Sequence, residues 1–258
     1  MKRTLVTGAI LAVLAGLAGA AEPQGAKQAA LSDVFQKPVD WAAATNRGKP
    51  VVVSERGAAQ GGPVRDDLLK CANWIYAGSK SSVCFSPKFL ETVRTNTTLE
   101  ADGQFTPVRL ADRQVFDFPF AVMTGEGTFT LQEAERQNLK EFLLRGGFLL
   151  ASSGCSCNEW AQAFRREIVR IFPDTPLKSI PMTHPMFHTV YDIAAIKLKH
   201  GGTALLQGLE VDGRIVMVYT SEGLNDTGNV KGCCCCGGNE IKNSQEINVN
   251  IFAYAAMH

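Results

Sequence analysis

The cysteines of this chain are its most distinctive chemical groups. Cys155 and Cys157 are separated by one residue, and four more cysteines stand side by side at positions 233–236. Thiolates are good ligands for zinc and for Cu(I), so these two clusters predict a soft-metal site. The predicted ligands are Cys155, Cys157, Cys233, Cys234, Cys235 and Cys236. The cofactor that such a set would hold is zinc or copper.

Disulfide bonding is an alternative use of the same cysteines. The chain has 8 cysteines, an even number, and disulfides persist in exported proteins. Bridges between residues 155–157 and 233–236 would tie down a long Gly-rich loop. Four consecutive cysteines fit ordinary bridges poorly, because neighbouring residues of a strand point to opposite sides. Metal binding and disulfide formation therefore both stay open.

Catalysis is a third use of the 155–157 cluster. A strand, a sharp turn that carries Cys155 and then a helix is the layout of a nucleophile elbow, where the helix N-terminus makes a thiol more acidic. His184 is the candidate base for Cys155, with His188 as the alternative base. Asp192 or Glu159 would then orient the imidazole. The sequence leaves open whether the protein is an enzyme.

The elements that must position these residues follow an alternating pattern. From Leu68 onward, apolar runs of strand length alternate with amphipathic helical stretches, which predicts a mostly parallel sheet covered on both faces. Ligands bind such a sheet beyond the carboxyl ends of its strands. Cys84 and both cysteine clusters follow predicted strands, so we expect seven thiols at one edge. Cys71, at the start of a strand, is the exception.

The individual elements are predicted from apolar runs and turn residues. Strands are expected over 71–76, 107–110, 120–123, 148–151 and 177–181, with a hairpin over 205–211 and 215–220 that turns at Asp212-Gly213. Helices are expected over 87–95 and 247–256. Another helix should open after the turn 152–157, with an apolar stripe of Trp160, Phe164, Ile168 and Ile171. One more helix should begin at a capping box of Thr130 and Glu133 and end at Gly146-Gly147. Its expected apolar stripe is Leu131, Ala134, Leu139, Phe142 and Leu143.

The N-terminus predicts export. Lys2 and Arg3 precede an apolar run over 5–17, and Ala-Gly-Ala follows over 18–20, as in a cleavable signal peptide. The run is shorter than the roughly 20 residues that span a membrane, so we expect no stable membrane anchor after cleavage. The predicted organisation is a signal peptide over 1–20, a linker or peripheral extension over 21–65 and one domain over 66–258. The expected location is periplasmic or extracellular, in a bacterium.

The overall charge excludes one class of partner. With 26 basic and 25 acidic residues, the chain has no charge bias that would favour nucleic acid. A protein of the cell envelope is the partner expected if the chain is a disulfide-stapled, non-catalytic interaction module.

Several motifs resemble a known family. They are Phe116-Asp117-Phe118-Pro119-Phe120, Met123-Thr124-Gly125-Glu126-Gly127, Leu144-Arg145-Gly146-Gly147-Phe148-Leu149, Phe164-Arg165-Arg166-Glu167 and His184-Pro185-Met186-Phe187-His188. In order and spacing, over about residues 68–256, the chain resembles the bacterial family called domain of unknown function 4159. The resemblance implies an α/β, flavodoxin-like three-layer sandwich, similar to class I glutamine amidotransferases and trehalose-utilisation proteins. It implies no activity.

The amidotransferase group uses an elbow cysteine together with a later His-Pro-Glu. In this chain His184-Pro185 is followed by Met186, and the elbow lacks its second glycine. The function expected from the sequence is therefore an exported domain that binds a ligand or a soft metal at the carboxyl edge of its sheet. The alternatives are a cysteine-dependent hydrolase or transferase built on Cys155 and His184, or the interaction module described above.

Overall fold

The structure is a computed structural model that describes residues 68–81, 84–230 and 240–258. All of these residues belong to one compact unit. The signal peptide and the extension predicted over residues 1–65 lie outside the described residues, as does the run Cys233–Cys236. Among the described helices, none combines the length and the apolar character needed to cross a membrane.

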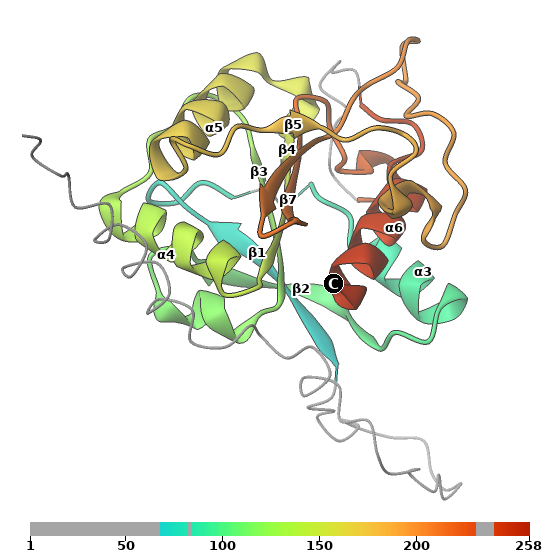
Figure 1. Ribbon diagram of the computed structural model, residues 1–258, viewed down its shortest axis with the longest axis horizontal. Helices are drawn as coiled ribbons and strands as arrows, with labels where there is room; N and C mark the ends of the chain where they lie inside the picture. Colours follow the sequence, from blue (N-terminus) through green and yellow to red (C-terminus); the bar gives the residue numbers. More distant parts are fainter. Residues whose placement is uncertain (1–67, 82–83, 231–239) are drawn as a thin grey trace, which may run out of the picture. The chain divides into compact units, whose positions relative to one another are not determined.

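One seven-stranded sheet forms the centre of the described domain (Figure 1). Its strands are β1 (Leu69–Ile75), β2 (Ala101–Arg109), β3 (Phe120–Gly125), β4 (Phe148–Ser153), β5 (Lys178–Ser179), β6 (Gln207–Val211) and β7 (Arg214–Thr220). Their order in the sheet is β2-β1-β3-β4-β7-β6-β5. The strands from β2 to β7 in this order are parallel, whereas β6 and β5 pair antiparallel at one edge. Strands β3 and β4 are buried at every position, as is typical of central strands that are covered on both faces.

Helices cover both faces of this sheet. Helices α4 (Glu133–Leu144) and α5 (Asn158–Ile171) lie on one face, and α3 (Lys88–Asn96) and α6 (Ser244–Met257) lie on the other (Figure 1). Short 3-10 helices occupy η1 (Arg113–Asp117), η2 (Gly154–Ser156), η3 (Pro185–His188) and η4 (Thr227–Asn229). The arrangement is the flavodoxin-like three-layer sandwich that the sequence predicted.

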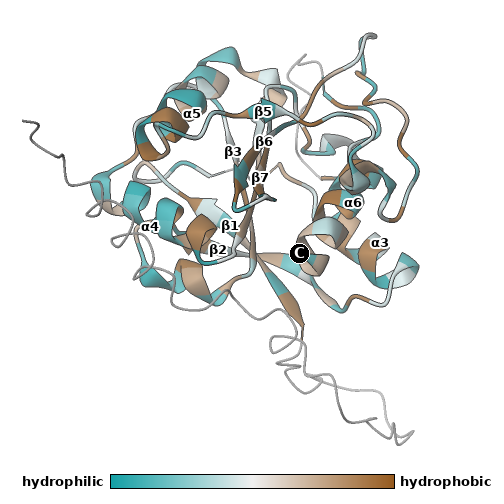
Figure 2. Cartoon of the chain, in the orientation of Figure 1, coloured by the Kyte–Doolittle hydropathy of each residue, from teal (hydrophilic) through white to brown (hydrophobic). Residues whose placement is uncertain are grey.

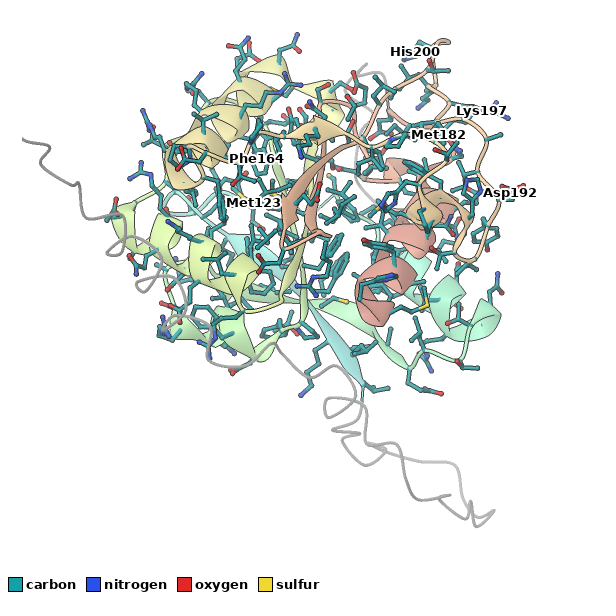
Figure 3. All side chains as sticks on the ribbon, in the orientation of Figure 1. Met123, Phe164, Met182, Asp192, Lys197 and His200 are labelled. Carbon is teal, nitrogen blue, oxygen red and sulfur yellow. The ribbon has the colours of Figure 1, made fainter. Side chains whose placement is uncertain are left out.

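Alternation along the strands divides the core into two halves. Phe120 and Val122 pack in the core beneath α3 and α6, while Ala121 and Met123 pack in the core beneath α4 and α5. Figure 2 shows hydrophobic colours on the strands and hydrophilic colours on much of the outer faces of α4 and α5. In Figure 3, Met123 and Phe164 lie between the sheet and α5, whereas the exposed Asp192 points away from the domain.

Helix α4 begins differently from its prediction. The expected capping box of Thr130 and Glu133 is wrong, because Gln132 and Glu135 form it instead. The Glu135 carboxylate accepts a hydrogen bond from Gln132 N at 2.7 Å and another from Ala77 N at 2.7 Å. This second bond, to the loop after β1, fixes Glu135 in the third helical position. The expected apolar stripe is also wrong at Ala134, which is exposed.

Other local predictions are confirmed. Trp160, Phe164 and Ile168 form the buried stripe of α5. The β6–β7 hairpin turns at Asp212 and Gly213, which both have positive φ, as a two-residue type I′ turn requires. Strands β2, β3 and β4 are longer than predicted, and β5 is only two residues long.

Candidate functional site

The carboxyl ends of the parallel strands bring several loops together. The chain passes from β1 through α3 to β2 on one side of β1, and then continues to β3 on its other side. The switch point of the sheet therefore lies between the carboxyl ends of β1 and β3, where open α/β sheets bind ligands. Lys80, after β1, spans this point by donating a hydrogen bond from Nζ to the Glu126 carbonyl oxygen at 3.0 Å.

Unfavourable backbone conformations concentrate at this edge. Among the described residues, five that are not glycine have positive φ, and four of them follow parallel strands: Ala77, Cys155, Ser156 and Asp226. The fifth, Asp212, belongs to the β6–β7 hairpin. A left-handed conformation costs a residue with a side chain about 1–2 kcal/mol, and such strain clusters at functional sites.

The turn after β4 has two strained residues in succession. Cys155 has φ 50° and ψ 31°, and Ser156 has φ 53°. Cys157 N closes the turn by donating to the Gly154 carbonyl oxygen at 3.0 Å. Gly154 has no room for a side chain, because a Cβ there would lie 2.9 Å from the Gly125 carbonyl oxygen. The β4 turn is thus pressed against the end of β3.

The thiol of Cys157 connects the loops after β3 and β4. Its Sγ accepts a hydrogen bond from Gly127 N at 3.2 Å and donates one to Glu159 Oε2 at 3.1 Å. The hydrogen bond from Cys157 lowers the pKa of the Glu159 carboxyl, assisted by the backbone N–H of Glu159. Glu159 therefore contacts the cysteine cluster itself, although the sequence analysis considered it as the partner of an imidazole.

A buried polar cluster supports this edge from beneath. Thr124 Oγ1 and Ser152 Oγ, near the ends of β3 and β4, donate to Asn225 Oδ1 at 3.3 and 3.1 Å. The Asn225 carbonyl oxygen accepts from Ser86 N at 2.8 Å. All four residues are buried. One asparagine after β7 therefore joins the ends of β3 and β4 to the loop that follows β1, in which Ser86 lies.

This cluster was not predicted, although the sequence contains a pattern that indicates it. Thr124 and Ser152 are the next-to-last residues of their strands and follow apolar runs, in Phe-Ala-Val-Met-Thr and Phe-Leu-Leu-Ala-Ser. A hydroxyl at that position of a buried strand needs a hydrogen-bond partner. The partner, Asn225, lies about 100 and 70 residues away along the chain, so the sequence did not identify it.

A second hydrogen-bonded group lies beside the switch point. Trp160 Nε1 donates to the Tyr76 hydroxyl at 2.6 Å, and that hydroxyl donates to the Thr124 carbonyl oxygen at 3.0 Å. Burial raises the pKa of Tyr76, against the opposing effect of the Trp160 hydrogen bond. Trp160 is fully buried.

The candidate base His184 lies far from the cysteine turn. His184 Nδ1 accepts from Met186 N at 3.2 Å, and its ring packs edge-on to Tyr254 at 5.4 Å. Tyr254 in turn contacts Phe148, the first residue of β4, whereas Cys155 follows the last residue of that strand. A six-residue strand is about 17 Å long. Cys155 therefore lies beyond the carboxyl ends of the strands, whereas His184 lies near their amino ends.

The alternative base forms the ion pair considered from the sequence. His188 Nδ1 contacts Asp192 Oδ1 at 2.6 Å, and His188 Nε2 contacts the Met182 carbonyl oxygen at 2.8 Å. The Asp192 carboxylate, followed by the Met182 carbonyl, raises the pKa of His188. Both ring nitrogens are therefore engaged within the loop 182–192, away from the cysteines of the described turn.

The predicted metal ligands are only partly within the described residues. Cys155 and Cys157 share the β4 turn as predicted, and Cys84 lies in the loop after β1. In residues 68–81, 84–230 and 240–258, no three His, Cys, Asp or Glu side chains form a group that could hold a metal. Cys71 lies in β1 with no exposed surface, and burial raises the pKa of its thiol.

The sheet order, the helices on both faces and the strained turns at the carboxyl edge define an open, mostly parallel α/β domain with its candidate site beyond the strand ends. The chain belongs to the family described as Domain of unknown function (DUF4159), whose model matches residues 77–256. A search of curated proteins found no match to the chain.

Proposed function

We propose that the domain binds a ligand or a soft metal ion at the carboxyl edge of its sheet through Cys155 and Cys157, with Cys233–Cys236 as further sulfur ligands. The observation that carries this proposal is the β4 turn, in which two consecutive strained residues present two cysteines beside the switch point. A fold retains such strain where the resulting geometry is used.

Two contacts in the turn support the same proposal. Ser156 Oγ is buried and has no hydrogen-bond partner among the described residues. A buried polar atom of this kind needs an ordered water or a bound group as its partner. Cys157 Sγ donates to Glu159 Oε2 at 3.1 Å, so a carboxylate oxygen lies beside the proposed sulfur ligand. A metal bound by the thiolate would release the thiol proton to solvent.

Metal titration of the full chain tests this proposal. Reduced protein is titrated with Zn²⁺ and with Cu⁺ against a competing chelator, and bound metal is measured by elemental analysis. We expect at least about one equivalent, with about tenfold weaker binding in Cys155→Ser and in Cys157→Ser, because each loses a thiolate ligand. Cys71→Ala is the matched control, and its metal affinity should equal that of the wild type. Unchanged binding in both turn variants would exclude the site.

A cysteine-dependent hydrolase or transferase is the second candidate. The observation in its favour is the positive φ of Cys155 on a strand–turn–helix unit, as in the nucleophile elbow of enzymes such as the class I glutamine amidotransferases. The likeness of this turn to the nucleophile elbow of those enzymes is itself part of what we propose. His184 lies near the amino ends of the strands. Glu159, which follows the turn, is therefore the nearer candidate for a base.

Ester hydrolysis distinguishes this second candidate. We expect the metal-free chain to release product from an activated acetyl ester in a burst of about one equivalent, and Cys155→Ser to abolish the burst. The His184→Ala variant should keep it. Acetylation of Cys155→Ser at the wild-type rate would contradict the proposal.

We further propose that the chain works outside the cytoplasm, in the periplasm or beyond it. The support is the signal-like segment at residues 1–20. In that compartment a cell-envelope protein remains the proposed partner, and thiols at the edge would need a bound metal or a disulfide to resist oxidation.

A further inference from the structure

A groove of about 430 Å³ lies between the outer faces of α4 and α5. Its lining residues are Glu133, Arg136, Gln137, Lys140, Arg170 and Ile171. Three of the six carry a positive charge and one carries a negative charge. The groove is therefore basic in a protein whose formal net charge is only +1.

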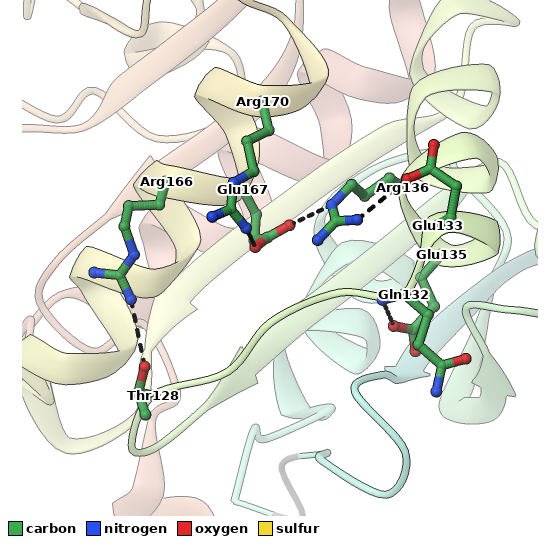
Figure 4. A network of polar contacts seen from close by, with 8 residues as sticks. All are labelled: Thr128, Gln132, Glu133, Glu135, Arg136, Arg166, Glu167 and Arg170. Carbon is green, nitrogen blue, oxygen red and sulfur yellow. Dashed lines mark hydrogen bonds and ion pairs between the residues drawn. The ribbon is translucent and has the colours of Figure 1, made fainter.

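A buried carboxylate holds the two arginines in place (Figure 4). Glu167, whose side chain is 2% exposed, accepts from Arg136 Nε through Oε2 at 2.7 Å and from Arg170 Nη1 through Oε1 at 2.7 Å. Arg136, which is 21% exposed, is thus held in position before any ligand arrives, and Arg170, which is 54% exposed, is tethered through one nitrogen. Preorganisation of this kind reduces the entropy that binding would otherwise cost.

The groove keeps a positive excess after these pairs are counted. Among the described residues, the ion pairs of Arg136 and Arg170 are to Glu133 and Glu167, and Lys140 has none. Glu133 is 85% exposed, which weakens its pairing with Arg136. In the contacts among the described residues, Arg136 donates through Nε and Nη1, and Arg170 donates through Nη1. Each guanidinium has five N–H groups, so donors remain for a ligand.

We infer that the α4–α5 groove binds a doubly charged oxyanion group of the phosphate type. Two guanidinium forks and one ammonium group match a tetrahedral dianion, which accepts several hydrogen bonds at once, better than they match a single carboxylate. The inference does not rest on the function proposed for the cysteine edge, since none of its residues is a cysteine.

Inorganic phosphate is the probe that tests this inference. The full chain is titrated with phosphate at constant ionic strength, and amide chemical shifts of α4 and α5 are followed by NMR. Saturable shifts are expected, with about tenfold weaker binding in Lys140→Gln and in Arg170→Gln, because each removes one charged donor. Acetate at the same concentration should bind more weakly than phosphate.

A charge-matched variant is the control. Arg94→Gln removes one positive charge from exposed α3, on the other face of the sheet, and should leave phosphate binding unchanged. Lys140 is exposed and takes part in no ion pair among the described residues, so its variant should fold normally, which the amide spectrum verifies. Absence of saturation, equal binding of acetate, or equal weakening by Arg94→Gln would overturn the inference.

Discussion

The described cysteine side chains lie in different environments, because they occupy different positions in the fold. Cys71 points into the core from β1, where burial keeps its thiol protonated by raising its pKa. Cys155 lies on a strained turn, and Cys157 on the same turn contacts the backbone of the β3 loop and a carboxylate. Unlike Cys71, the two turn residues combine access with polar neighbours, so among these three cysteines they are where reactivity or metal binding is expected.

Substitution of Gly125 tests how tightly side chains pack at the carboxyl end of β3. A Cβ at Gly125 would overlap the Tyr76 hydroxyl and lie 3.1 Å from Trp160 Nε1. We expect Gly125→Ala to lower the free energy of unfolding by about 1–3 kcal/mol, because the Tyr76–Trp160 hydrogen bond must shift. Urea denaturation measures the change.

Gly103→Ala is the control for this substitution. The nearest atom to a Cβ at Gly103 is Arg94 Nη1, at 3.7 Å, which is an ordinary contact. Its stability should stay within about 0.5 kcal/mol of the wild type. If Gly125→Ala proved as stable as Gly103→Ala, the close packing around Tyr76 would contribute nothing measurable to the free energy of unfolding.

Elements are joined to one another here by a few buried polar side chains. Glu135 connects the start of α4 to the loop after β1, and Asn225 connects the loop after β7 to the ends of β3 and β4. The helices and strands themselves were predictable because periodicity marks them. The start of α4 was not, since the deciding bond from Ala77 N comes from 58 residues away.

Glu135→Gln tests the connection between α4 and β1. The carboxylate accepts two backbone hydrogen bonds of 2.7 Å, and the amide would leave one N–H donor without a good acceptor. We expect a loss of about 1–3 kcal/mol in the free energy of unfolding, with faster hydrogen exchange at the Ala77 amide.

Glu133→Gln is the matched control for Glu135→Gln. It removes the same charge from the same helical turn, but its side chain is 85% exposed and pairs only with Arg136 among the described ion pairs. Its effect should remain below about 1 kcal/mol. Equal losses from both substitutions would show that the charge of the helix N-terminus matters, and not the connection to β1.

At the level of the whole molecule, the sequence predicted the layers and the place of Cys155 and Cys157 after β4, but not where His184 lies relative to them. Alternating runs reveal a parallel sheet, and a parallel sheet implies that Cys155 and Cys157 lie beyond the strand ends. Whether Cys155 and His184 lie close together depends on the path of the long chain segment between them. The segment after β5 instead carries His184 to the side of Tyr254, at the amino edge. Spacing along the sequence contains no signal for that path.

The order of the strands also determines when this domain can be completed. Strand β7 is the last to be synthesised, yet it lies inside the sheet, with Leu149 of β4 paired to Met217 on one side and β6 paired on the other. Until residues near position 220 are available, β4 has an unpaired edge and Asn225 cannot join the loops. Contacts so distant in sequence form slowly. A nascent chain therefore stays incompletely folded through most of its synthesis, and the core of the described domain closes only when β7 is available.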